Sequence, residues 1–330
     1  MFDTLKTQKQ LASIFAPSGR ESELINKLSE LSKPFSDDQR TDAMGNLILL
    51  KKGSGAKKLM LSAHADSIGI VVTHIDEKGF LRFCPVGGVH VKDVLHRTIR
   101  FSNGVLGAVG VDGKVKPNDL KLSDAFIDIG ASDEKSARKF VNVGDFGVYH
   151  AETYTTGSNI VSPCLDDRIG CVVLLQVLSM LQHPKNDVYF VFSAQEEVGC
   201  RGAKTAAYDI APDIGIAVDI CYAGDVPEAE PLSATKLGGG AAIKYRDASL
   251  LGHPKVIKLL EDIAKKANIP FQRDVMSFGG TDAGAISISR GGVASCAVSI
   301  PTRYGHSPVE TAALSDIEAC SRLLLAVCNA

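Results

Sequence analysis

Apolar and polar positions alternate along the chain in two ways, and each predicts a different kind of element. Residues 4–15 and 21–31 carry apolar side chains at helical spacing, whereas 46–51 and 58–63 are short apolar runs bounded by glycine and lysine. The first pattern predicts amphipathic helices and the second predicts buried strands. Ser18 lies in the turn between the two helices, where we expect it to cap the second one.

After about residue 160, predicted strands and helices alternate. The strands are expected at 188–192, 214–220, 241–245 and 293–300, and the helices at 167–181, 202–208, 253–267, 281–289 and 312–327. Alternation of this kind is typical of a sheet whose strands are joined by crossing helices. We therefore expect an α/β fold with a mainly parallel sheet and helices on both faces.

Residues 71–154 follow another pattern. Short apolar segments recur at 70–75, 80–83, 98–101, 105–111, 125–129 and 146–149, separated by glycines and Asx turns. This spacing is typical of an all-β module, and 132–140 is the one helix that we expect within it. The turn at 76–79 predicts a hairpin. We expect a catalytic α/β domain at 1–70 and 160–330, interrupted by an inserted all-β, barrel-like domain at 71–159.

Composition narrows the choice of partners. The 330 residues carry a formal net charge of −2, so no strong field would draw the chain to nucleic acid, and no apolar run is long enough to cross a membrane. We expect neither partner. The eight cysteines form no CxxC pair and several lie in apolar segments, which is typical of buried thiols in a reducing compartment. We expect a cytoplasmic protein.

Acidic residues and histidines gather where the predicted strands end. They are His64 and Asp66 after 58–63, Glu196 and Glu197 after 188–192, Asp219 after 214–218, and His306 after 293–300. Asp166 and Asp167 stand where the insertion returns and a helix begins. Because the carboxyl ends of parallel strands meet at one edge of a sheet, these side chains should converge.

Taken singly, each of these residues has an ordinary structural explanation, such as capping a helix or lying on a solvated surface. Taken together, crowded carboxylates would repel one another unless cations were bound between them. Mixed histidine and carboxylate ligands suit zinc and related ions, and two ions that share a carboxylate form a hydrolytic centre. Glu196 and Glu197 are adjacent, so we expect one to bind metal and the other to move protons.

Six short motifs occur in a fixed order. They are His-Ala-Asp at 64–66, Asp-Asp-Arg at 166–168, Glu-Glu-Val-Gly at 196–199, Val-Asp at 218–219, Gly-Gly-Thr-Asp-Ala at 279–283 and Gly-His-Ser-Pro at 305–308. In this set the chain resembles the glutamyl and deblocking aminopeptidase family, whose tetrahedral dodecameric members are called TET aminopeptidases. The resemblance extends over essentially the whole chain.

The resemblance implies two divalent ions, zinc or cobalt with manganese as a further option. One would be held by His64, Asp166 and Asp219, and the other by Asp166, Glu197 and His306. It implies Glu196 as general base, Asp66 as the residue that orients His64, and a cis bond between Asp166 and Asp167. It also implies short peptides with a free N-terminus as substrates, and a homo-oligomer, from dimer to dodecamer, in which the inserted domain makes contacts and covers the active site.

Three other functions stay open at this point. An endoglucanase-type glycosidase needs two carboxylates that face each other across a sugar, which adjacent glutamates do not readily supply. The chain also has no tryptophan and only 6% aromatic residues to stack on a polysaccharide. A non-catalytic assembly protein would have kept the fold and lost the chemistry. A related dinuclear carboxypeptidase or deacylase is the third. The pocket for the N-terminal residue is expected around 222–240 and 278–283.

Overall fold

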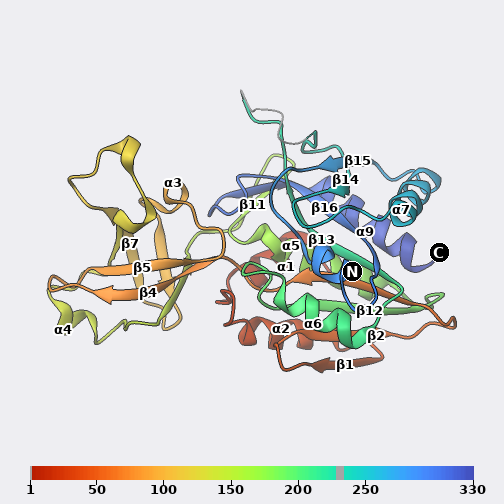
Figure 1. Ribbon diagram of the computed structural model, residues 1–330, viewed down its shortest axis with the longest axis horizontal. Helices are drawn as coiled ribbons and strands as arrows, with labels where there is room; N and C mark the ends of the chain where they lie inside the picture. The colour runs from red at the N-terminus through yellow and green to blue at the C-terminus, as the bar shows by residue number, and fades with distance from the viewer. Residues whose placement is uncertain (1, 228–233) are drawn as a thin grey trace.

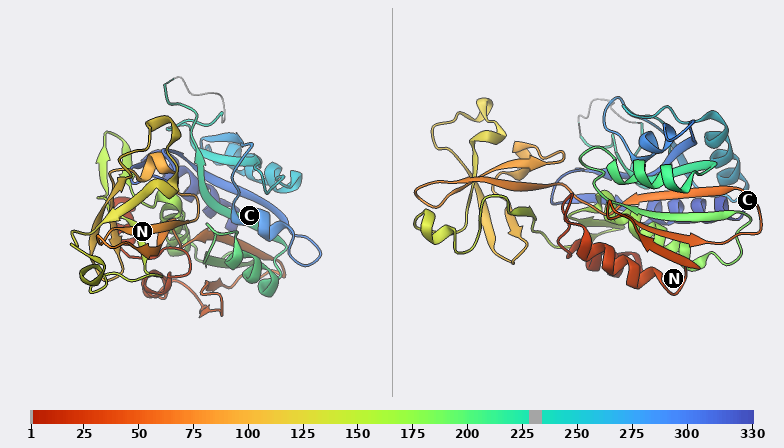
Figure 2. Two further views of the ribbon diagram at one scale, coloured as in Figure 1. Left: turned by 60° about the vertical axis from the view of Figure 1, so that its left-hand side comes forward. Right: turned by 60° about the horizontal axis from the view of Figure 1, so that its bottom comes forward.

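The computed structural model describes residues 2–227 and 234–330, which form a large layered body and a smaller barrel (Figure 1). The barrel stands at one end of the longest dimension of the molecule (Figure 2). Among the described residues no helix is both long and apolar enough to cross a membrane. The predicted α/β fold with an inserted barrel is confirmed.

The large body is built on one sheet, which has eleven strands over the described residues. They are β1 (Asp38–Thr41), β2 (Leu47–Lys51), β3 (Lys58–His64), β10 (Tyr154–Thr156), β11 (Asn159–Ser162), β12 (Asp187–Ser193), β13 (Ile214–Tyr222), β14 (Ala241–Arg246), β15 (Phe271–Val275), β16 (Ala294–Arg303) and β17 (Glu310–Ala313). The central strands β12, β3, β13 and β16 run parallel, in that order. Their apolar runs are buried on both faces, as expected of the centre of a parallel sheet.

Helices cover both faces of this sheet. One face carries α1 (Thr4–Ala12), α2 (Ser22–Ser32), α5 (Leu165–Met180), α7 (Pro254–Lys266) and α9 (Leu314–Cys328), and the other carries α6 (Arg201–Ile210) and α8 (Asp282–Ser287). The α5 helix is buried on nearly every side, because α1, α2, α9 and the sheet surround it. Its first turn therefore has a fixed position relative to the ends of the neighbouring strands.

The barrel closes from six strands within the described residues 69–149. They are β4 (Gly69–Ile75), β5 (Leu81–Val86), β6 (Thr98–Phe101), β7 (Leu106–Val111), β8 (Ala125–Asp128) and β9 (Phe146–Tyr149). The predicted hairpin joins β4 to β5, and Gly79 adopts the positive φ of +86° that its turn requires. Inward-facing apolar residues alternate with outward ones, as on β6, where Ile99 and Phe101 are buried.

Some predicted elements were wrong or missing. The helix expected at 132–140 shrinks to α4 (Glu134–Ala137), and it is not alone in the insertion, since α3 (Val91–Val94) and two 3₁₀ turns, η1 (Pro117–Asp119) and η2 (Leu122–Asp124), accompany it. Strands β1, β10, β11, β15 and β17 were not expected. Several are short or polar edge strands, such as the exposed β10, and so lack the apolar pattern that predicts a strand.

The expected cap at Ser18 was also wrong. The α2 helix begins at Ser22, after Glu21, so Ser18 lies too far upstream to cap it. Its hydroxyl instead donates to Oδ2 of Asp66 at 2.6 Å, and both residues are buried. This bond ties the turn after α1 to the loop that follows β3.

Candidate metal centre

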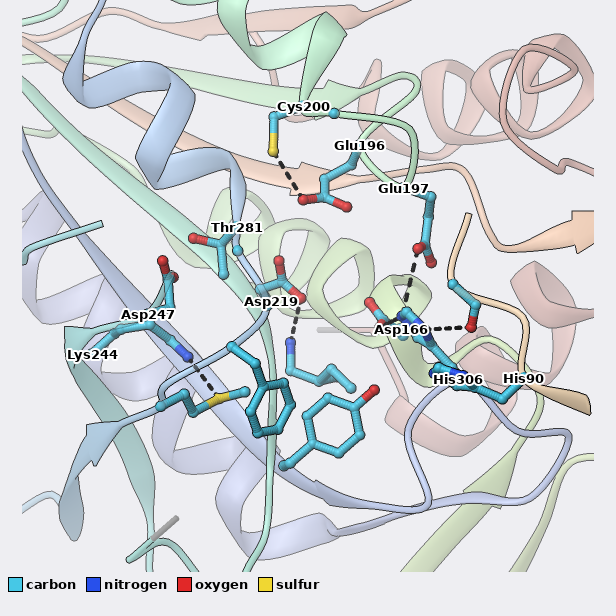
Figure 3. A pocket seen from close by; sticks show the side chains of 18 residues that line it. His90, Asp166, Glu196, Glu197, Cys200, Asp219, Lys244, Asp247, Thr281 and His306 are labelled. Carbon is cyan, nitrogen blue, oxygen red and sulfur yellow. Dashed lines mark hydrogen bonds and ion pairs between the residues drawn. The ribbon is translucent and has the colours of Figure 1, made fainter. Parts of the chain in front are cut away.

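The parallel order of the sheet brings its carboxyl ends together at one edge. His64 is the last residue of β3 and pairs with Ser193, the last residue of β12, while Asp219 lies near the end of β13. A cavity of about 450 Å³ opens at this edge. Asp166, Glu196, Glu197, Asp219 and His306 line it, and the close view shows them around one space (Figure 3).

Asp166 stands between the two predicted histidine ligands. Its Oδ1 is 2.9 Å from Nε2 of His64, and its Oδ2 is 3.2 Å from Nε2 of His306. The peptide bond between Asp166 and Asp167 is cis, as predicted. Each oxygen of one carboxylate thus faces a different imidazole, which is the arrangement that a bridging ligand needs.

Backbone carbonyls fix the orientation of both imidazoles. Nδ1 of His64 donates to the carbonyl of Asp66 at 3.1 Å, and Nδ1 of His306 donates to the carbonyl of Gly88 at 3.0 Å. Because a carbonyl can only accept, the proton lies on Nδ1 in each neutral ring. Nε2 of each ring faces an oxygen of Asp166, so a bound cation would take the place of the proton between them.

The carboxylate of Asp66 holds the loop that carries the two glutamates. It accepts from the backbone N–H of Glu196 at 2.9 Å and of Glu197 at 3.2 Å, in addition to the Ser18 hydroxyl. Oδ1 of Asp66 is 3.6 Å from Nδ1 of His64, further than the carbonyl of the same residue. Asp66 therefore positions His64 through its backbone and the glutamate loop through its side chain.

Crowding of carboxylates shifts their pKa values. Burial raises the pKa of Glu196 to about 8, with Asp282 and Glu197 acting in the same direction and His64 opposing them. Burial and Asp166 raise the pKa of Glu197 to about 8, against the effect of His306. Burial also raises the pKa of Asp219. The protein alone supplies too little positive charge for these groups to ionise together at neutral pH.

This donor set fits divalent cations. It offers two imidazole nitrogens and several buried carboxylates, and Oε1 of Glu197 has no hydrogen-bond partner among the described residues. Ligand atoms of His64, Asp166 and Glu197 lie within 4.8 Å of one another. This group combines residues predicted for both ions, since His64 was predicted for one ion, Glu197 for the other, and Asp166 for both. Cations bound here would supply the missing positive charge.

Several residues of the site gave no signal in the sequence. Glu310 is buried and accepts from the backbone N–H of Asp166 at 3.0 Å and of His306 at 2.7 Å, so it joins the two loops. Gly88 contributes only a carbonyl oxygen, from the inserted segment 71–159. Glu310 lies four residues after His306, and this spacing is the one feature of the sequence that could have drawn attention to it. Nothing in the sequence marks Gly88.

Comparison with known proteins then decides the family. A model of the M42 glutamyl aminopeptidase family matches residues 45–323. The chain belongs to this family. M42 members are hydrolases that carry aminopeptidase names: an inferred aminopeptidase of Acetivibrio thermocellus is 47% identical over 99% of this chain and 98% of its own length. The lysyl aminopeptidase of Pyrococcus furiosus is 34% identical over 90% of this chain and 88% of its own length.

Solved structures agree with this assignment. An aminopeptidase from Desulfurococcus kamchatkensis has a TM-score of 0.95 at 40% identity, covering 99% of this chain and 94% of that one. The TET1 peptidase of Pyrococcus horikoshii, which can assemble into a tetrahedron or a large octahedral shell, has a TM-score of 0.89 at 31% identity and 99% coverage of both chains. A Thermotoga maritima structure named an endoglucanase has a TM-score of 0.83 at 31% identity, and the match covers 98% of this chain and 96% of that one.

Proposed function

We propose that this M42 protein is a metal-dependent aminopeptidase that removes N-terminal residues from short peptides with two divalent cations, zinc or cobalt, or manganese. His64, Asp166 and Asp219 would hold one ion, and Asp166, Glu197 and His306 the other. The observation that carries the proposal is the Asp166 carboxylate, whose two oxygens face Nε2 of His64 and Nε2 of His306 at 2.9 and 3.2 Å. A shared carboxylate between two histidines is the core of a co-catalytic site.

When bound, the cations would polarise the peptide carbonyl and lower the pKa of a water molecule. The remaining work belongs to the chain. Glu196 lines the cavity, and its Oε2 is 4.0 Å from Nε2 of His64, further than Asp166 is. In our proposal Glu196 takes a proton from the attacking water and returns it to the leaving amine. Asp66 keeps that carboxylate in place through the backbone of the loop.

A glycosidase is the first rival, and one structural relative carries an endoglucanase name. Glu196 and Glu197 enter the cavity from the same loop, so they do not face each other across a sugar. Glu197 is 3.5 Å from Nε2 of His306, a pairing that suits metal binding. A non-catalytic protein would not need to retain Glu196 with the complete donor set. A carboxypeptidase or deacylase shares the chemistry, and the aminopeptidase names of the M42 relatives favour our proposal.

We further propose that residues 71–159 form an oligomerisation domain that also covers the active site of a catalytic domain at 1–70 and 160–330. The assembly would be a homo-oligomer, from dimer to dodecamer, in the cytoplasm. Support comes from the TET1 relative and from exposed apolar residues on and near the barrel, namely Leu106, Phe140, Val143 and Tyr154. Of the segments proposed to select the N-terminal residue, 222–240 includes residues 228–233, which lie outside the described residues.

One substrate screen tests the proposal. Aminoacyl chromogenic amides, their N-acetylated counterparts and a soluble cellulose derivative would be offered to the metal-stripped protein after adding Zn²⁺, Co²⁺ or Mn²⁺. We expect hydrolysis of the free amines only, dependent on added metal. Equal cleavage of acetylated and free substrates, or activity on the cellulose derivative alone, would contradict it.

A further inference from the structure

At the edge of the cavity lies a second group of side chains that could hold a metal ion; Glu196 and Cys200 line the cavity, and the buried Asp282 lies beside them. Sγ of Cys200, a carboxylate oxygen of Glu196 and one of Asp282 lie within 4.8 Å of one another. Sγ of Cys200 lies 3.0 Å from Oε1 of Glu196 and donates its proton to it (Figure 3). We propose that these three side chains form a further, inhibitory cation site for a thiophilic divalent ion, such as Zn²⁺ in excess or Cd²⁺.

Asp282 supplies the observation that points to a ligand. Its side chain is 2% exposed, and Oδ2 accepts from the hydroxyls of Ser62 at 2.6 Å and Ser193 at 2.5 Å. Oδ1 has no hydrogen-bond partner among the described residues. A buried carboxylate oxygen without a partner is costly, and a cation would satisfy it. The two serines hold the carboxylate in place, so little rearrangement is needed.

The donor set selects the type of ion. One sulfur and two carboxylate oxygens suit zinc and softer ions, whereas the centre around Asp166 offers nitrogen and oxygen alone. On binding, the S–H bond of Cys200 breaks, its proton passes to solvent, and bonds form from the ion to the thiolate and to the two carboxylates. No electron is transferred. Cys200 lines the cavity, so the ion can enter from the substrate side.

Inhibition follows from the part that Glu196 plays. A carboxylate that is bound to a cation is a weaker base, so it would no longer accept a proton from the attacking water. This consequence rests on the proposed function, since it requires Glu196 to be the base. Binding of the ion does not rest on it, because the three donors are present whatever the reaction.

Cd²⁺ titration of the cobalt-loaded protein tests the site with two readouts. The first is the ultraviolet charge-transfer absorption that a cadmium–thiolate bond produces. The second is the rate on an aminoacyl amide, expressed relative to the uninhibited rate of the same variant. Cys200→Ser is the deciding substitution, because serine keeps a hydroxyl donor for Glu196 but lacks the soft sulfur. Cys84→Ser is the matched control, since Cys84 is an exposed thiol on β5 of the barrel.

We expect the ultraviolet absorption of wild type and Cys84→Ser to saturate at one Cd²⁺ ion per chain, bound at Cys200. Both proteins should lose activity over the same range of Cd²⁺ concentration. Cys200→Ser should lose that absorption and need more Cd²⁺ for the same inhibition, because a hydroxyl is a poorer ligand for a soft ion than a thiolate. Unchanged absorption and unchanged inhibition in Cys200→Ser would overturn the proposal and place the ion elsewhere. If no form of the protein hydrolyses amides, the proposed function fails, and the absorption still decides whether the site exists.

Discussion

The large body and the barrel bury different kinds of side chain. From Ile68 to Glu152 no polar or charged residue is fully buried among the described residues, although the hydroxyl of the half-buried Tyr149 is enclosed, and the buried residues of the barrel core are apolar. The body buries many, including His64, Asp66, Asp166, Asp219 and Asp282. Burying a charge is unfavourable unless it is paired or binds a metal. The contrast separates a region that buries charged side chains from a region whose core is apolar.

Among substitutions in the charged region of the body, loss of Asp166 should have the largest effect on metal content and activity. Because its two oxygens face both histidines, Asp166→Ala should empty both proposed ion positions and abolish activity, whereas His306→Ala should weaken mainly one. Elemental analysis of metal per chain measures the difference. Two ions per chain in Asp166→Ala would show that the carboxylate does not bridge.

Glu196→Gln separates chemistry from metal binding within the same charged region. The variant keeps the shape of the side chain but cannot accept the proton, so kcat should fall by about 10²–10⁴-fold while metal content stays at the wild-type level. Steady-state kinetics on an aminoacyl amide, together with elemental analysis, provide the two values. Activity within a few-fold of wild type would remove Glu196 from the role of base.

The barrel should respond to loss of packing rather than loss of charge. Phe101 is 1% exposed in its apolar core, so Phe101→Ala should cost about 3–5 kcal/mol of stability in urea unfolding. Phe140→Ala is the control, because Phe140 is 55% exposed on the same domain and should change stability by at most about 0.5 kcal/mol. In light scattering, Phe140→Ala should reduce the assembled fraction if that face makes contacts. A stable Phe101→Ala variant would show that the barrel does not depend on this core.

The smallest expected effect is a change in stability, and it concerns Glu261, a buried carboxylate of the body outside the proposed metal centre. Glu261 accepts from Arg273 at 2.8 Å and from Tyr245 at 2.7 Å, and these bonds lower its pKa to about 2. A lowered carboxyl pKa adds stability that is complete above its usual pKa of 4.5 and is lost as pH falls toward 2. Because Arg273 is largely solvent-exposed, we expect Glu261→Gln to cost only about 1 kcal/mol at pH 7.

Urea unfolding of wild type and Glu261→Gln at several pH values measures that difference. It should be constant from pH 7 to about 5 and shrink below pH 4.5. Asp262→Asn, which removes an exposed i,i+4 pair with Lys258 on the same helix, is the control and should show no comparable pH dependence. A difference that grows on acidification would give the wrong sign and contradict the assignment.

The sequence predicts those parts of the molecule that leave a pattern in it. Strands β3, β12, β13 and β16 are apolar runs, so their carboxyl ends and the residues beyond them could be foreseen. Edge strands such as β10 are polar and short, and no periodicity predicts them. The proposed ligand set came from the resemblance carried by ordered motifs, whereas Glu310 and Ser18 act through contacts between distant segments. Such contacts depend on the assembled fold, which a single sequence does not display.

The contact between Gly88 and His306 also bears on whether the two parts of the chain could work apart. The carbonyl of Gly88, between β5 and α3, accepts from Nδ1 of His306, and a Cβ on Gly88 would lie 2.5 Å from that nitrogen. A chain cut back to the α/β body would lose this acceptor. The inserted segment therefore helps to orient a proposed ligand to which it contributes no side chain.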